Sequence, residues 1–445
     1  MRAPAAVVIG SLTAALLTPA ALAQPAAPVR VIAEWEPALG TIISWPLGIP
    51  SDLVIELART DRLYVLVTGQ SAENQARNTF SSWGIDLAQV EFIHTSVQTH
   101  WPRDWGPHQI FDAGGAWSIL DPIFEGYPWV ANPCVPINSP GGYVGDNAVN
   151  IDVAAYFGAP LFSFPGYLTG GNFLVDGHAA AFSTCAMVGE NQQIWTEPQF
   201  LALAEDWLGV SNYHIVDNTE DFGIQHIDCW LKPLDEETLL VKRAPAWHEE
   251  HDRIESNLQM LANATNAYGR PYKIVRIDCP PYSNDQIAAY TNSLILNRKV
   301  FVPLFNIPGD LQAIQTFQEA MPGHEIIGFP WGSWYYYDAL HCRTRALFDR
   351  HMLHLTHRPL DAVTPYDPAG FRVEAFIDDR SEAGLVASEL LLHWRVRGGQ
   401  DWQTETLVTT GAPDTYEAWI PAQISRATVE YYLSAADQSG RAESL

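Results

Sequence analysis

Between Val31 and Leu360, two kinds of hydrophobic pattern alternate along the chain. Short apolar runs such as YVLVT at Tyr64–Thr68 and VEFIHT at Val90–Thr95 predict β-strands, and Ala72–Trp83 between them predicts a helix. The pattern continues with predicted helices at His248–Ala267 and Leu311–Ala320 and predicted strands at Lys273–Ile277, in SLILNRKVFVPLF and in EIIGF. Because strands and helices alternate, the sequence predicts an α/β domain over residues 31–360.

The pattern changes after His357. The segment RPLDAVTPYDPAG contains three prolines and predicts a linker. Beyond it lie short alternating strands at regular spacing, namely FRVEAFIDD, SELLLHWRVRG, TETLVTTG, YEAWIP and VEYYLSAAD. We therefore expect a small immunoglobulin-like β-sandwich over residues 366–445, although the Cys–Trp–Cys framework of true immunoglobulin domains is missing.

The composition is that of a globular protein, with 445 residues of which 47% are apolar and 17% charged. The formal net charge of −26 argues against nucleic acids and anionic membranes as partners. Such a negative field can serve solubility or can concentrate a cationic substrate, and the charge alone does not distinguish the two.

The N-terminus has the features of a secretory signal. Arg2 supplies the positive start, Ala5–Leu17 the apolar stretch and Ala21–Ala23 a small-residue cleavage site. We therefore expect residues 1–23 to be a signal peptide and the protein to be secreted or periplasmic. No later apolar run reaches the ~20 residues that a membrane-spanning helix needs.

The chain has an odd number of cysteines, so at least one thiol stays free. The five are Cys134, Cys185, Cys229, Cys279 and Cys342, and the sequence leaves their pairing open. Cys342 lies in DALHCRTRALFDR, among cationic residues that could lower its pKa and make it a nucleophile. His341 is adjacent, but neighbours on an extended chain face apart, so we do not expect it to act as the base.

Two other short motifs could carry chemistry. In WPRDWGPH, Arg103 and Asp104 lie between tryptophans, which suits either a structural ion pair or a carboxylate held against a flat wall for a planar cation. In QHIDCW, a strand would point His226 and Asp228 to one face and Cys229 to the other. A structural hydrogen-bonded pair explains the second motif equally well.

Two histidine clusters are weaker candidates. HEEH at His248–His251 lacks the four-residue histidine spacing of zinc proteases and predicts a charged helix start. His351, His354 and His357 repeat every three residues and could ligate a metal, although surface or capping positions are commoner for such residues.

Five motifs in order resemble the agmatine deiminase-like branch of the guanidine-modifying enzymes, most closely the bacterial protein-arginine deiminases. They are WPRDWGP, GGNFLVDG, HID, YTNSLILN and ALHCRT. The resemblance covers residues 31–360. It implies a five-bladed, pseudo-symmetric α/β propeller as the catalytic domain, and the signal peptide and appended sandwich favour the protein-arginine type over the agmatine type.

The resemblance also implies roles for individual residues. Cys342 would be the nucleophile, His226 the acid/base, and Asp104 and Asp228 the carboxylates that hold the guanidinium. The residues expected to line or support the substrate site are Trp101, Arg103 and Asn292. No cofactor is implied, and a structural cation is left open. Hydrolysis of peptidyl-arginine to peptidyl-citrulline and ammonia, through a covalent thiouronium on cysteine, is the expected reaction.

One departure from the family bears on the substrate. Relatives that prefer a C-terminal arginine hold its carboxylate with arginines, yet no Lys or Arg occurs between Arg103 and Lys232. We therefore predict that internal arginine in peptides or proteins is accepted at least as well. The alternatives are a deiminase of a small guanidine such as agmatine or free arginine, an amidinotransferase, a non-catalytic binding protein and a zinc hydrolase.

Overall fold

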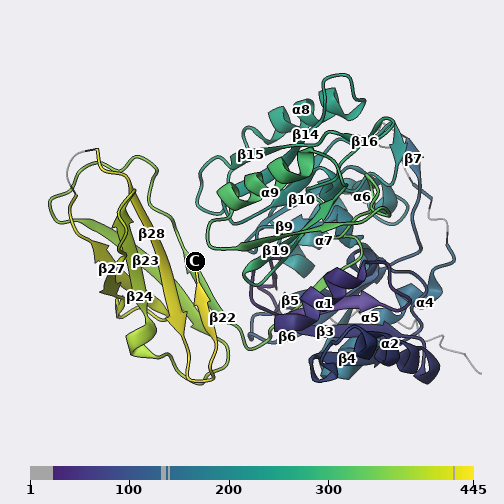
Figure 1. Cartoon of the computed structure of the whole chain (residues 1–445), viewed down its shortest axis with the longest axis horizontal. Helices are drawn as coiled ribbons and strands as arrows, with labels where there is room; N and C mark the ends of the chain where they lie inside the picture. Colours follow the sequence, from purple (N-terminus) through teal and green to yellow (C-terminus); the bar gives the residue numbers. More distant parts are fainter. Residues whose placement is uncertain (1–23, 132–136, 139–140, 424–425) are drawn as a thin grey trace, which may run out of the picture.

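The computed structural model describes residues 24–131, 137–138, 141–423 and 426–445 (Figure 1). The predicted signal peptide at residues 1–23 and Cys134 lie outside these ranges. Within them the chain forms an N-terminal part (residues 30–348) of several small sheets with helices, and a C-terminal module (residues 353–444) made almost entirely of strands. Figure 1 shows the module beside the N-terminal part.

Five sheets of the N-terminal part follow one pattern, in which two parallel strands are joined by helical segments. The parallel pairs are β2–β3 (Ala38–Ser44, Arg62–Val67), β6–β8 (Trp117–Ile123, Leu161–Tyr167), β10–β11 (Ala180–Thr184, Asn212–Val216), β14–β15 (Thr238–Arg243, Lys273–Asp278) and β19–β20 (Lys299–Leu304, Glu325–Pro330). The main connecting helices are α1 (Ser51–Thr60), α5 (Val149–Phe157), α7 (Glu197–Leu208), α8 (Glu250–Leu261) and α9 (Gly309–Ala320). This repetition confirms the predicted α/β class.

In each unit an antiparallel strand pairs with the first strand of the parallel pair. These strands are β21 (Arg345–Phe348), β5 (His108–Phe111), β9 (Leu174–Val175), β13 (Leu231–Pro233) and β18 (Leu294–Leu296). In the first unit, helix α2 (Gln70–Ser82) leads to a further strand, β4 (Val90–His94), which pairs with β3. In the second unit, β1 (Arg30–Val31) pairs with β5. Since β21 joins the sheet of β2, the end of the N-terminal part returns to its beginning. The five-bladed propeller arrangement itself stays a prediction.

Helix α8 is shorter than the sequence predicts. It ends at Leu261 instead of continuing to Ala267. The side-chain oxygen of Asn266 accepts hydrogen bonds from the backbone amides of Tyr268 and Arg270, both at 3.0 Å. Such local bonding by asparagine stabilises a turn in place of a helix.

The C-terminal module consists of two four-stranded sheets that share one apolar core. The first contains β22 (Leu353–His357), β23 (Phe371–Asp379), β27 (Thr415–Ile420) and β26 (Val408–Thr409); the second contains β25 (Gln403–Thr406), β24 (Leu391–Val396), β28 (Val429–Ala436) and β29 (Ala442–Ser444). The assignment of this module as immunoglobulin-like stays a prediction.

The module begins before the predicted linker, because β22 pairs along its length with β23. On β22, Leu353, Leu355 and His357 are buried in alternation, which is the period of a strand. The histidines in HMLHLTH obscured this alternation in the sequence. Across the residues that the structure describes, no helix is long and apolar enough to cross a membrane.

Candidate active site

The predicted site residues lie on, or directly before, the segments that lead from one unit of the N-terminal part to the next. These segments are α3 (Pro102–Trp105), η2 (Gly170–Asn172), η3 (Ile227–Cys229), residues 289–293 and residues 339–343. The turn α3 packs on η2, and η2 packs on η3. Each of these five segments occupies the equivalent position in its unit, directly before the antiparallel strand. This shared position explains how residues so distant in sequence meet in one place.

Cys342 is buried, and Asn292 positions it. The Nδ2 of Asn292 donates a hydrogen bond to Cys342 Sγ at 3.2 Å. Its Oδ1 accepts from the backbone amides of Ala339, His341 and Cys342 at 3.0–3.3 Å. One fully buried amide side chain thus fixes both the thiol and the turn that carries it.

Asp228 lies beside the thiol, with its Oδ2 3.8 Å from Cys342 Sγ. The same oxygen is 2.7 Å from His341 Nδ1, and the other ring nitrogen of His341 is 2.5 Å from Glu34 Oε2. Burial opposes ionisation of Asp228, but the hydrogen bond and charge of His341 outweigh it and lower the carboxyl pKa. Lys232 extends the chain of contacts, with its Nζ 2.6 Å from Glu34 Oε1.

Asp104 and His226 converge on Gly171. The backbone amide of Gly171 donates to Asp104 Oδ1 at 3.0 Å, and His226 Nδ1 is 3.6 Å from the same oxygen. A Cβ added to Gly171 would lie 2.6 Å from Asp104 Oδ1, 2.7 Å from His226 Nδ1 and 3.2 Å from Asp228 Oδ2. Only glycine leaves these three groups room to gather here.

Protonation at this cluster follows from burial. Burial and the neighbouring Asp228 raise the pKa of Asp104 well above its usual value. Burial lowers the pKa of His226 to about 4, although Asp228 and Asp338 oppose the shift. The His226 imidazole is therefore neutral at physiological pH and can accept a proton.

The prediction of a strand at HID is wrong. Residues Ile227–Cys229 form a 3₁₀ turn, not a strand. His226 and Asp228 nevertheless both approach Gly171, while the Cys229 thiol contacts the Tyr337 carbonyl at 3.4 Å. The sequence thus predicted that His226 and Asp228 lie together because alternate residues of a strand share a face, but in the structure a 3₁₀ turn brings them together.

A cavity of about 400 Å³ opens onto Cys342. Aromatic side chains dominate its wall, namely Trp101, Tyr127, Trp129, Tyr143, Tyr335 and Tyr337. Trp101 packs edge-on against Tyr127 with ring centroids 5.1 Å apart. Asp104, Asp338 and Arg343 contribute the charges, so a flat cation entering this cavity meets rings and carboxylates.

The cationic surroundings expected for Cys342 do not face its thiol. Arg343 forms two hydrogen bonds with Asp338, at 2.8 and 2.7 Å. Arg345 donates to the carbonyls of Arg103 and Pro107. Burial, followed by Asp228 and Asp104, instead raises the pKa of the thiol well above its usual value.

Arg103, predicted to contact substrate, lies behind the cavity. Its Nε donates to the His341 carbonyl at 3.3 Å, and its Nη2 is 3.3 Å from Glu34 Oε2. It is buried and is not among the residues that line the cavity at Cys342. Arg103 therefore supports Glu34 and His341 rather than facing the cavity.

The remaining candidates lie elsewhere. Among the described residues no group of three or more metal-ligating side chains could hold an ion. His354 and His357 are strand residues, and the ring nitrogens of His357 contact the Glu374 carbonyl and the Tyr431 hydroxyl. Cys185 is disulfide-bonded, whereas Cys229, Cys279 and Cys342 are free.

Three residues near the site were not singled out from the sequence, and a fourth, His341, was considered only as a base and set aside. Gly171 belongs to the GGN motif, whose paired glycines could have signalled close packing. Tyr127 and Glu34 carry no such signal, and neither do the contacts of His341, because all of these depend on packing between distant segments.

Known proteins resemble the N-terminal part of this chain. The sequence model of a family described as Porphyromonas-type peptidyl-arginine deiminase matches residues 30–347. The agmatine deiminase of Pseudomonas syringae pv. tomato is 22% identical over 349 residues, covering 67% of this chain and 89% of that protein. The agmatine deiminase of Pseudomonas fluorescens is 22% identical over 312 residues, covering 62% and 79%.

The fold also has solved counterparts. The structure of the agmatine deiminase of Enterococcus faecalis superposes with a TM-score of 0.61 at 19% identity, covering 72% of this chain and 96% of that one. The agmatine deiminase of C. jejuni gives a TM-score of 0.58 over 72% and 96%, also at 19% identity. At this level of identity the likeness concerns the fold.

Proposed function

The chain belongs to the Porphyromonas-type peptidyl-arginine deiminase family, and we propose that it hydrolyses the guanidinium group of a small guanidine such as agmatine, releasing ammonia. Membership makes it an enzyme of the guanidine-modifying deiminases, which are hydrolases of C–N bonds. The observation that carries the proposal is the position of the Cys342 thiol, 3.8 Å from Asp228 and in the wall of an aromatic cavity that also contains Asp104.

The two carboxylates explain how an unreactive carbon is attacked. A guanidinium is protonated at all physiological pH values, and its resonance makes the central carbon a poor electrophile. Asp104 and Asp228 hold its nitrogens through charge-assisted hydrogen bonds and direct the carbon toward Cys342.

Binding of the cation also activates the thiol. In the empty site burial and the two carboxylates raise the pKa of Cys342, so the thiol is protonated. A guanidinium between Asp104 and Asp228 favours the ionised form of Asp104, whose pKa is raised in the empty site, and its positive charge also favours the thiolate. His226, neutral because burial lowers its pKa to about 4, accepts the thiol proton.

The remaining steps use the same groups and water. The sulfur forms a bond to the guanidinium carbon, His226 returns its proton to one nitrogen, and the C–N bond breaks to release ammonia. Water, deprotonated by His226, then adds to the thiouronium carbon and the C–S bond breaks. The products are a ureido compound and the free thiol. Since side chains and water supply every step, we propose that no cofactor is required.

The wall of the cavity favours a substrate without a free carboxylate. Arg343 is the single guanidinium among the described residues that line it, and Asp338 already neutralises that group. A substrate carboxylate, as in free arginine, therefore has no cation to meet. Aromatic faces such as Trp101 and Trp129 instead suit the ammonium of agmatine.

Internal peptidyl-arginine is the second candidate. The family description favours it, and so does the lack of a carboxylate clamp in the described wall. The backbone of an internal arginine carries no charge near the guanidinium, so this substrate does not place an unpaired carboxylate in the cavity. The product would be peptidyl-citrulline.

The test compares substrates on the full chain without its first 23 residues. Agmatine, free arginine and matched peptides with internal or C-terminal arginine are incubated, and the ureido product and ammonia are measured. We expect agmatine or internal arginine to be turned over in preference to both carboxylate-bearing forms, and the Cys342→Ser variant to be inactive. Turnover that depends on an added amine acceptor, or that survives in Cys342→Ser, would overturn the proposal.

A further inference from the structure

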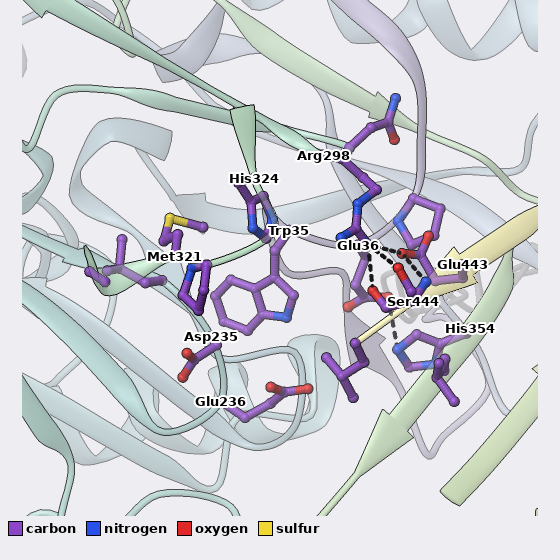
Figure 2. Close-up of a pocket in the computed structure, with 17 residues that line it drawn as sticks. Trp35, Glu36, Asp235, Glu236, Arg298, Met321, His324, His354, Glu443 and Ser444 are labelled. Carbon is purple, nitrogen blue, oxygen red and sulfur yellow. Dashed lines mark hydrogen bonds and ion pairs between the residues drawn. The ribbon is translucent and has the colours of Figure 1, made fainter. Parts of the chain in front are cut away.

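A second cavity lies where the N-terminal part meets the C-terminal module (Figure 2). Its volume is about 230 Å³, and it shares no lining residue with the cavity at Cys342. Four segments of the N-terminal part and two strands of the module form its wall, namely residues 35–37, 234–236, 297–298 and 320–324 together with residues from β22 and β29. Nothing in the deiminase chemistry uses it.

The charge of this wall is unbalanced. Its four carboxyl groups belong to Glu36, Asp235, Glu236 and Glu443, and Arg298 is the one guanidinium among the described lining residues. Arg298 donates to the carbonyls of Ser444 and Gly323 at 2.8 and 3.0 Å.

Glu36 is neutralised from outside the cavity, because Arg30 forms an ion pair with it at 2.5 Å. Asp235 and Glu236, by contrast, have no cationic partner within the described parts of the chain. The wall therefore presents two carboxyl groups that no cationic side chain balances among the residues that the structure describes.

Glu236 is the most informative of these groups. Its residue is only 8% exposed, and among the described residues none other than itself donates a hydrogen bond to its carboxyl. Burial, followed by Asp235, Glu36 and Asp176, raises its pKa to about 8. The charged or titratable groups around it are Asp235, Glu36, Asp176, Tyr268, His324, His354, Arg298 and Glu443. A buried acid without a partner costs free energy that a bound cation would offset.

The other walls suit an organic cation rather than a metal ion. Figure 2 shows the Trp35 indole in the middle of the lining residues, with Asp235 and Glu236 on one side of it. Leu234, Pro37 and Met321 add apolar surface. A metal ion is held by several converging carboxylate, histidine or cysteine ligands, and no group of three or more such side chains that could hold an ion exists among the described residues.

We propose that this junction cavity binds a small organic cation, an alkylammonium or alkylguanidinium ion, with its charge at Glu236 and Asp235 and its body against Trp35. The site holds the N-terminal part and the module together through the ligand, because the wall contains residues of both. It is independent of the proposed reaction at Cys342, since the two cavities have no residue in common.

Isothermal titration calorimetry with n-butylammonium chloride tests the proposal on the full chain. We expect one saturable site per chain, weakened about tenfold or more in Glu236→Gln and unchanged in Asp104→Asn, which alters the other cavity. Absence of saturable binding overturns the proposal. So does binding that Asp104→Asn removes and Glu236→Gln does not.

Proton release gives a second readout. Because the carboxyl of Glu236 has a pKa of about 8, it is protonated near neutral pH and must ionise to meet the cation. Binding enthalpies in phosphate and in Tris should therefore differ by the heat of up to one released proton for the wild type, and not for Glu236→Gln. Should Glu236→Gln fail to fold, Asp235→Asn at the half-buried rim is the substitute, and unchanged affinity there would count against the site.

Discussion

The imidazole of His341 lies 2.7 Å from the carboxylate of Asp228, although His341 immediately precedes the proposed nucleophile in the chain. Its other nitrogen contacts Glu34, so one buried ring connects the proposed substrate-binding carboxylate to a residue near the N-terminus. His341 thus acts behind the site: it sets the position and ionisation of Asp228 without facing the cavity.

Replacing His341 with glutamine is therefore expected to impair catalysis through Asp228. Loss of the hydrogen bond lets the pKa of Asp228 rise, so the acid limb of kcat/KM should move to higher pH. Displacement of Asp228 should lower kcat by about 100-fold. Breaking a buried ionic contact should also cost about 3–5 kcal/mol in the free energy of unfolding.

The control for this substitution is His94→Gln. His94 is exposed and contacts Glu73 at 2.6 Å on the surface, where such pairs contribute about 0–1 kcal/mol. We expect an unchanged pH profile. An acid limb in His341→Gln that coincides with that of the wild type would show that His341 does not influence Asp228.

Asn292 offers a test of how the thiol is held. In Asn292→Asp a carboxylate can still accept from the amides at residues 339, 341 and 342, but the donor to Cys342 Sγ is replaced by a negative charge. The pKa of Cys342 should rise further, so alkylation by iodoacetamide should require higher pH than in the wild type. The exposed Asn306 provides the matched control, Asn306→Asp.

Asn292→Ala removes the acceptor as well. The buried amides of Ala339 and Cys342 then lose their partner, each at a cost of about 1–3 kcal/mol unless water replaces it, whereas the amide of His341 keeps its bond to the backbone carbonyl of residue 292. Lower thermal stability than in Asn292→Asp is the expected result, measured by thermal unfolding. Equal stability of the two variants would mean that the acceptor contributes little.

Gly171→Ala tests the crowding around the cluster. The new Cβ would lie within 3.2 Å of Asp104, His226 and Asp228, so at least one of them must move. We expect kcat/KM to fall by about 100-fold or more. Gly332→Ala is the control, because nothing lies within 4 Å of its Cβ position. Activity of Gly171→Ala within a few-fold of wild type would show that these groups are not held as closely as the structure has them.

Sequence patterns predicted the elements better than the contacts between them. The strand and helix periods identified the α/β class because each β-α-β unit is local in sequence. The prediction of cationic surroundings for Cys342 was wrong, because those surroundings depend on contacts that are not local in sequence. Arg343 and Arg345 are near it in sequence, yet each turns to a partner elsewhere, Asp338 in one case and the Arg103 carbonyl in the other.

Non-local contacts also explain the other differences. Glu34 is near the N-terminus and His341 is more than three hundred residues later, so no spacing rule connects them. The HID segment forms a 3₁₀ turn because its neighbours pack it against η2, which overrides the alternation that favoured a strand.

His354 gives a final prediction, which concerns the pH dependence of stability. It lies on β22 beside Glu36, and burial lowers its pKa to about 4. As pH falls below about 6.5, the unfolded chain takes up a proton at this histidine while the folded chain does so only near 4. The contribution of His354 to stability is therefore present above about pH 6.5 and is lost progressively down to about pH 4.

Replacing His354 with glutamine should reduce this loss. Denaturant unfolding measured near pH 7 and near pH 5 should give a smaller difference for His354→Gln than for the wild type. Part of the difference should persist, because burial also lowers the pKa values of His226 and His324 to about 4. His351→Gln, at an exposed position in the same segment, should behave as the wild type does. Identical pH dependence in His354→Gln and His351→Gln would show that His354 does not resist protonation in the folded protein, and that the junction tolerates a charge there.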